Sequence, residues 1–167
     1  MAAGSTYTPI ATTTVSGGST SEVEFASISG SYTDLIIVGN LGAATNSYTS
    51  ARFNSDTGSN YSNTELYGNG SSAGSDRNSN KSIADFAFNV QNQSGVNGNF
   101  IAQIMNYSNS TTYKTVLNRG SQASSDVIAQ VGLWRSTAAI TSVTLLNSGA
   151  VNFSSNSTFT LYGIAAA

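Results

Sequence analysis

Short runs in which apolar and polar residues alternate recur along the whole chain, and clusters of Gly, Ser and Asn separate them. A period of two indicates β-strands with one buried and one solvated face, as in antiparallel sheets. Helical periodicity is hard to find. The spacing of the runs is typical of a β-sandwich or barrel. We expect strands at roughly 6–15, 22–28, 34–42, 50–54, 64–67, 82–91, 99–107, 112–119, 126–135, 140–147 and 157–164.

The alternation also predicts which residues share a face. The expected sets are Ala84, Phe86, Phe88 and Val90 against Asp85 and Asn89; Phe100, Ala102 and Ile104 against Gln103; and Val127, Ala129, Val131 and Leu133 against Asp126, Gln130 and Trp134. The run "DLIIVGNL" is apolar throughout, which predicts a central strand covered on both faces. The polar stretch "GNGSSAGSDRNSNK", residues 68–81, is expected to be a long loop and the most mobile segment.

A chain of 167 residues suits one domain. We expect a single antiparallel β-sandwich over 21–167. The Thr-rich segment 1–20 carries little charge and is expected to be extended. It is a candidate assembly arm that pairs with a neighbouring subunit by strand addition.

Composition excludes several classes of function. Charged residues are 8% of the chain, against about 25% in typical domains, and the net charge is −2. The six Lys and Arg residues are scattered singly, so the many phosphate contacts of nucleic-acid binding are not expected. The chain has no Cys and no His, so zinc, haem and iron–sulfur centres lose their usual ligands. No segment reaches the ~18 apolar residues of a membrane helix.

The segment "RFNSDTGSNYSNTELYGNG", residues 52–70, offers a candidate calcium loop. On the EF-hand pattern Asn54, Asp56 and Gly58 take positions 1, 3 and 5, and Glu65 takes position 12. Ser59 stands where the pattern requires Gly, and no flanking helices are predicted. The alternative is that Asn54 and Asp56 make Asx-turns at a tight corner. Weak Ca²⁺ binding by Asp56 and Glu65 stays open, and no other cofactor is expected.

Catalytic patterns are weak. Glu22 and Glu24 lie two residues apart on one strand face, at a spacing that a glycosidase could use, but plain alternation with Val23 explains them equally well. A serine nucleophile lacks a His base and a Gly-x-Ser-x-Gly elbow, and pairing with Lys81 or Lys114 has no motif. We therefore expect no catalytic residues and no enzyme.

Tyrosines beside predicted loops form the candidate binding surface. Tyr combines contact area with a polar tip, which suits both sugar binding and protein interfaces. The alternative is that these rings lie at the sheet margins. Trp134 either forms a binding pair with Arg135 or closes one end of the core. The candidate partner or glycan surface comprises Tyr48, Asn54, Asp56, Tyr61, Tyr67, Tyr107 and Tyr113.

Three blocks together resemble a family of virion structural proteins of tailed phages, common in phages of cyanobacteria and other aquatic bacteria. These blocks are "SYTDLIIVGNL", "RFNSDTGSNYSNTELYGNGSSAGSDRNSN" and "LWRSTAAITSVTLL…NFSSNSTFTLYGI", and the resemblance covers about residues 23–164. It implies a non-enzymatic, jelly-roll-like β-sandwich displayed on a phage particle. It carries over no catalytic residues. Unlike long fibre proteins, this chain shows no coiled-coil shaft or collagen-like repeat.

The expected function is therefore that of a virion structural protein that decorates or cements the capsid exterior through subunit contacts. The alternative is a receptor-binding or carbohydrate-binding head of a tail fibre. Expected partners are the major capsid protein or fibre and tail proteins, further copies of the chain in a homotrimer, and, for the alternative, a host surface glycan. The expected location is the exterior of the virion, and neither nucleic acid nor membrane is expected as a partner.

Overall fold

The computed structural model describes residues 6–17, 20–42, 47–87 and 96–165. Within these ranges the regular secondary structure consists of β-strands and one short 3₁₀ turn. No helix in the described ranges is long and apolar enough to span a membrane. The elements are β1 (Tyr7–Thr14), β2 (Glu22–Phe25), β3 (Asp34–Leu41), β4 (Thr49–Phe53), β5 (Tyr61–Gly68), β6 (Ala73–Lys81), β7 (Ala84–Ala87), β8 (Gly98–Met105), β9 (Lys114–Ser121), β10 (Val127–Trp134), β11 (Val143–Asn147), η1 (Ser148–Ala150) and β12 (Thr158–Ile164).

Two antiparallel sheets pack face to face. One has eight strands in the order β1-β12-β3-β8-β9-β10-β5-β6, and the other has four in the order β2-β11-β4-β7. Strands β1, β12, β3 and β8 are consecutive in the large sheet, and β2, β11, β4 and β7 form the small sheet. Numbered along the chain without β5, β6, β9 and β10, these eight strands have the orders 1-8-3-6 and 2-7-4-5, which define a jelly roll. The expected all-β sandwich with jelly-roll topology is confirmed.

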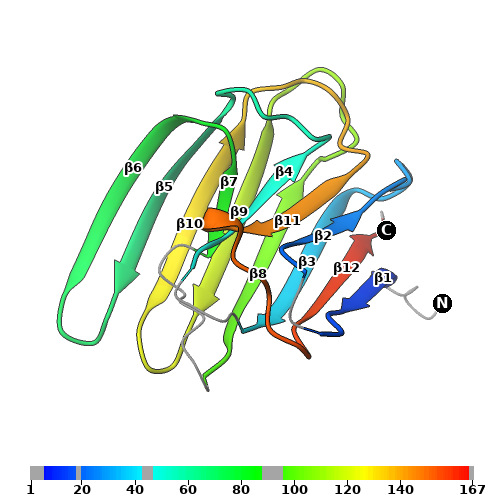
Figure 1. Ribbon diagram of the computed structural model, residues 1–167. Helices are drawn as coiled ribbons and strands as arrows, with labels where there is room; N and C mark the ends of the chain where they lie inside the picture. The colour runs from blue at the N-terminus through cyan, green and yellow to red at the C-terminus, as the bar shows by residue number, and fades with distance from the viewer. Residues whose placement is uncertain (1–5, 18–19, 43–46, 88–95, 166–167) are drawn as a thin grey trace.

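Two hairpins are inserted into the jelly roll. The β5–β6 hairpin lies between β4 and β7 in the chain, and the β9–β10 hairpin lies between β8 and β11. They pair with each other through β10 and β5, and β9 pairs with β8, so together they double the width of one sheet. Figure 1 shows the β5–β6 hairpin extending beyond the small sheet. The large sheet therefore has one face over the core and a broad opposite face, which we call the outer face.

Aromatic rings fill the core between the sheets. Phe53 lies against Trp134 and Tyr61, with ring centroids 5.6 and 6.0 Å apart, and against Phe86 at 6.3 Å. Phe86 in turn contacts Phe100 at 5.8 Å. All five side chains are buried. Each such ring contributes roughly 1.5–3 kcal/mol by leaving water, so this cluster stabilises the contact between the sheets. The interpretation of Trp134 as a core residue is confirmed.

The strand positions agree with the expected runs, with one exception. Residues 73–81, expected within a mobile loop, form the edge strand β6 paired with β5. Strand β6 is exposed along most of its length, so it lacks the alternation that marks the other strands. Its charged residues, Asp76, Arg77 and Lys81, are typical of a protected sheet edge.

The predicted sets of residues that share a face are confirmed in β8 and β10, although in β10 the more apolar set is the exposed one. Phe100, Ala102 and Ile104 are buried. In β10 the apolar set that includes Val127 and Val131 faces out, and Gln130 is buried. Trp134 and Ile128 account for this orientation, because they share a face with Gln130 and are buried in the core. Trp134 is the largest side chain of the strand, so its burial outweighs that of the smaller residues on the other face. The predicted positions of Phe88, Asn89 and Val90 lie outside the described residues.

The N-terminal segment is part of the sheet. Strand β1 pairs antiparallel with β12 of its own chain, with a register shift between Pro9 and Ala11. Val15, which follows it, is buried in the core. The extended segment that was expected to serve as an arm for a neighbour is thus, at residues 7–14, an edge strand of this molecule. Residues 1–5 and 18–19 of that segment lie outside the described residues.

Strand β3 is a central strand, as expected, but it is covered on one face only. Leu35 and Ile37 point into the core and are fully buried. On the outer face Ile36 is nearly buried by its neighbours, whereas Val38 is 37% exposed. The apolar character of both faces of this strand is therefore not explained by the sandwich core.

Candidate functional site

The corner between β4 and β5 is a rigid hydrogen-bonded turn. Asp56 accepts hydrogen bonds from the backbone N–H of Gly58 (2.8 Å), the side-chain amide of Asn60 (2.9 Å) and the indole N–H of Trp134 (2.7 Å). Burial alone would raise the pKa of Asp56, but these three donors outweigh it and lower the pKa below its usual value. The prediction of an Asx-turn at Asp56 is confirmed, and its carboxylate also holds the core tryptophan in place.

Asn54 connects the same corner to the segment before β11. It adopts a left-handed backbone conformation (φ 51°), which Asn tolerates better than most residues. Its side-chain amide donates to the carbonyl of Ala139 (2.8 Å), and its oxygen accepts from the backbone N–H groups of Thr141 (2.8 Å) and Ser142 (3.1 Å). Asn54 is therefore a structural link between two loops, and its polar atoms are already used.

Asp56 and Glu65 do not form one calcium site. Asp56 lies in the corner, beside Trp134, whereas Glu65 lies four residues beyond Tyr61 on β5, roughly 13 Å along the strand. Glu65 is buried inside the sandwich. Among the described residues, no group of three or more His, Cys, Asp or Glu side chains is arranged to hold a metal ion. The EF-hand alignment of this segment is wrong because β5 separates the two carboxylates.

Glu65 belongs to a buried polar network on the core side of β5, β10 and β9. Its carboxylate accepts from the side-chain amides of Asn63 (3.4 Å) and Gln130 (3.3 Å), and Asn118 donates to Gln130 (3.2 Å). One carboxylate oxygen has no partner among the described residues. Burial, followed by the negative charges of Asp85 and Asp76, raises the pKa of Glu65 to about 7; Lys81 and the Asn63 amide lower it by less.

This network predicts an unusual pH dependence of stability. Because the pKa of Glu65 is about 7 in the folded protein and 4.5 as a free side chain, the folded state binds the proton more tightly. The free energy of unfolding should be larger below pH 4.5 and should fall as pH rises from there to 7, by about 2 kcal/mol. Glu65→Gln should remove this decline and leave the protein more stable than wild type at pH 8. Urea unfolding of both proteins at pH 5 and pH 8 measures it, and equal declines in the two proteins would contradict it.

Two tyrosines of the expected binding surface are in the core. Tyr61 and Tyr107 are fully buried, so their rings are not available to a partner, and their inclusion in that surface is wrong. The hydroxyl of Tyr61 accepts from the backbone N–H of Phe53 (3.1 Å) and donates to the carbonyl of Asp56 (3.2 Å). Burial raises the pKa of Tyr61 to about 12 and also raises the pKa of Tyr107, whose hydroxyl donates to the carbonyl of Ser29. Both hydroxyls fix loops onto the core.

The other three tyrosines do not gather around the corner either. Tyr48 is half-buried, and Tyr67 is half-buried against the core. Tyr113 is 54% exposed and lies in the loop before β9. Residues 43–46, shortly before Tyr48, lie outside the described residues. Of the seven expected surface residues, Tyr113 is the one that presents a largely exposed aromatic ring.

The residues considered for catalysis have structural partners. Glu22 and Glu24 are exposed on β2 and flank the buried Val23, as plain alternation requires. The Lys81 ammonium pairs with Asp85. The buried Lys114 donates to the carbonyls of Thr112 (2.7 Å) and Thr137 (3.2 Å), and desolvation lowers its pKa. Neither lysine has a serine hydroxyl among these partners, so the contacts supply no Ser–Lys dyad.

The outer face of the large sheet is apolar over several strands. Its exposed side chains include Leu66 (64%), Val127 (60%), Leu117 (46%) and Val131 (42%), and Val38 and Met105 lie on the same face. An exposed apolar patch of this kind usually marks an interaction site. Strand pairing orders the side chains into two neighbouring rows, Leu66–Ala129–Arg119–Ile101–Val38 and Thr64–Val131–Leu117–Gln103–Ile36.

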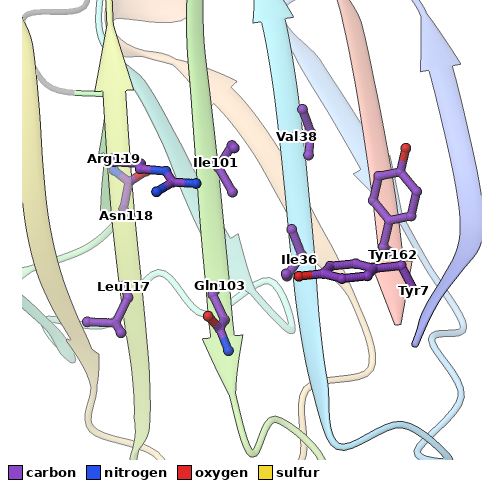
Figure 2. Close-up of a pocket in the computed structure, with 9 residues that line it drawn as sticks. All are labelled: Tyr7, Ile36, Val38, Ile101, Gln103, Leu117, Asn118, Arg119 and Tyr162. Carbon is purple, nitrogen blue, oxygen red and sulfur yellow. The ribbon is translucent and has the colours of Figure 1, made fainter. Parts of the chain in front are cut away.

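A groove of about 550 Å³ lies on this face, across β9, β8, β3, β12 and β1. In Figure 2 the ring of Tyr7 extends from β1 across β12 towards Ile36, and Arg119 extends from β9 towards Ile101. Gln103 is held by a hydrogen bond to the carboxylate of Asp34 (2.8 Å). The residues that line the groove are Tyr7, Ile36, Val38, Ile101, Gln103, Leu117, Asn118, Arg119 and Tyr162.

The groove was not predicted from the sequence, although two signals point to it. "DLIIVGNL" is apolar on both faces, while only one of them meets the core. In β10, both alternating sets contain large apolar residues, so one of them had to face out. An apolar set on each face of a strand is therefore a sequence signal for an apolar outer face in addition to the sandwich core.

Comparisons with known proteins add no family assignment: no family model matches the sequence, and a search of curated proteins found no match.

Proposed function

We propose that this chain is a non-enzymatic phage virion structural protein that decorates the capsid exterior and cements neighbouring subunits. The observation that carries the proposal is the apolar outer face of the large sheet, where Leu117, Val131 and Val38 are exposed around a groove. In a monomer these side chains would remain in water; against a virion subunit they would be buried, at roughly 25 cal/mol per Å².

Other features support this proposal. Jelly rolls occur in viral capsid domains, although a fold alone does not determine function. The sequence blocks resemble virion proteins of tailed phages. The corner around Asp56, by contrast, is a structural element, because its polar atoms already hold Trp134 and the adjacent loop. The partners that we propose are the major capsid protein or the fibre and tail proteins, with the chain itself forming a homotrimer.

The test is reattachment to particles that lack this chain. Particles produced by a phage with the gene deleted are mixed with purified protein, and the bound fraction is measured by sedimentation. We expect saturable binding at a fixed number of copies per particle. Sedimentation velocity of the free protein tests the trimer separately. Purified protein that stays in the supernatant at every concentration would contradict the proposal.

The second candidate is a fibre head that binds a host glycan. It is favoured by one observation: Tyr7, Tyr162, Gln103 and Arg119 lie in a single groove, where aromatic rings and hydrogen-bonding groups could hold a sugar. A glycan array is the direct test. Selective binding to one sugar that Tyr162→Ala abolishes would favour this candidate over the capsid role.

A further inference from the structure

Arg119 is a cation without a counter-ion in the middle of an apolar surface. It is exposed on β9, where the paired residues on either side are Ile101 on β8 and Ala129 on β10. Among the described residues the one ion pair is that between Lys81 and Asp85, so the Arg119 guanidinium has no carboxylate. A planar guanidinium presents five N–H donors and binds a carboxylate by two parallel hydrogen bonds.

Among the described residues, the outer face carries two arginines and one aspartate. Arg77 on β6 is exposed on the same face, since it pairs with Thr64. Asp34, at the start of β3, also lies on this face. Its carboxylate already accepts hydrogen bonds from Gln103 (2.8 Å) and from the backbone N–H of Asn106 (2.8 Å). This face therefore has an excess of one positive charge, although the chain as a whole carries a net charge of −2.

This charge distribution argues against a second copy of the chain as the occupant of the groove. In an interface between two outer faces, the acid that could meet Arg119 of the other copy is Asp34, whose carboxylate already accepts two hydrogen bonds. Burying like charges together is costly, whereas one carboxylate opposite Arg119 would be strongly favoured once water is excluded. A homotrimer would thus use a different surface.

We propose that the groove binds an extended segment of a neighbouring virion protein in which a Glu or Asp lies between two apolar side chains on one face. The carboxylate would pair with Arg119, and the apolar side chains would cover Ile101 on β8 and Leu117 on β9. In an extended peptide, alternate residues lie about 6.6–7 Å apart on one face, a spacing that fits a groove several strands wide. This inference rests on the proposed function, because it names the chemistry of the partner that the face would bind.

The test uses two synthetic peptides, Ac-Thr-Leu-Thr-Glu-Thr-Leu-Thr-NH₂ and the same peptide with Gln in place of Glu. Their binding to isotope-labelled protein is followed by NMR, which locates the affected residues. We expect shifts in the groove and about ten-fold tighter binding of the Glu peptide, as one charge-assisted pair provides. Arg119→Gln should abolish the preference, Arg77→Gln on the same face should keep it, and added salt should weaken it.

Equal binding of the two peptides to the wild-type protein, shifts that lie outside the groove, or no binding of either peptide would overturn the inference. These results can be separated from a failure of the proposed function. If the protein still reattaches to particles while the Glu preference is absent, only the carboxylate partner is wrong. If reattachment also fails, the virion role itself is wrong.

Discussion

Asp56→Ala should lower the free energy of unfolding by about 3 kcal/mol. The substitution removes the acceptor of the Trp134 indole N–H, which is held at 2.7 Å and belongs to a tryptophan that is 2% exposed. A buried donor left without a partner costs about 1–3 kcal/mol, and hydrogen bonds to charged groups contribute more than neutral ones. The bonds from Asn60 and Gly58 are lost as well. The expected loss therefore exceeds the ~1 kcal/mol of an ordinary turn or cap residue.

Asp76→Ala is the matched control for this prediction. Asp76 is exposed on the edge strand β6, and its removal changes the net charge equally. Urea unfolding at pH 7 should give a loss below about 0.5 kcal/mol for the control. Asp56→Asn should be intermediate, because the amide keeps an acceptor oxygen but not the charge. If Asp56→Ala were no more destabilising than Asp76→Ala, the corner would not hold the tryptophan. A melting temperature that rises with added Ca²⁺ would restore the metal interpretation.

Leu117→Glu should reduce reattachment to particles at least about 100-fold without unfolding the protein. Leu117 lies in the groove but is 46% exposed, so Glu can be accommodated in the free protein. In the bound state the same carboxylate would be buried against apolar side chains, at a cost of several kcal/mol. The binding constant from sedimentation and the melting temperature are measured on the same preparation.

Tyr113→Glu provides the control and discriminates between two surfaces. Tyr113 is comparably exposed, but it lies in the loop before β9 and outside the groove. If the outer face is the interface, this variant should bind particles as the wild type does. Loss of binding by Tyr113→Glu, with normal binding by Leu117→Glu, would move the interface to the loop surface that the sequence suggested.

The strands and the antiparallel sandwich were predictable because a two-residue period follows directly from a sheet with one buried face. Phe100, Ala102 and Ile104 are the clearest example, since all three are buried as expected. Strand β6 escaped detection because an edge strand beyond the small sheet has no buried face to impose a pattern. In β10 the alternation separates the two faces correctly but does not show which one is buried, because Gln130 looks like a surface residue, whereas it is buried in the network around Glu65.

The candidate site was less predictable than the fold. Tyr61 and Tyr107 resemble surface residues because they border loops, yet each buries its ring and uses its hydroxyl to satisfy loop backbone groups. The groove brings together residues from Tyr7 to Tyr162, near opposite ends of the chain. That neighbourhood depends on the order β1-β12-β3-β8-β9, which alternation along single strands does not specify.

The orientation of this chain in a particle reconstruction tests the central claim most directly. We predict density for the jelly roll on the exterior of the capsid, with Leu117, Ile101 and Val38 of the large sheet turned towards a neighbouring virion subunit and excluded from solvent. A carboxylate of that subunit should lie beside Arg119. Density in which the outer face of the large sheet points into solvent, while another surface holds the protein on the particle, would contradict the account.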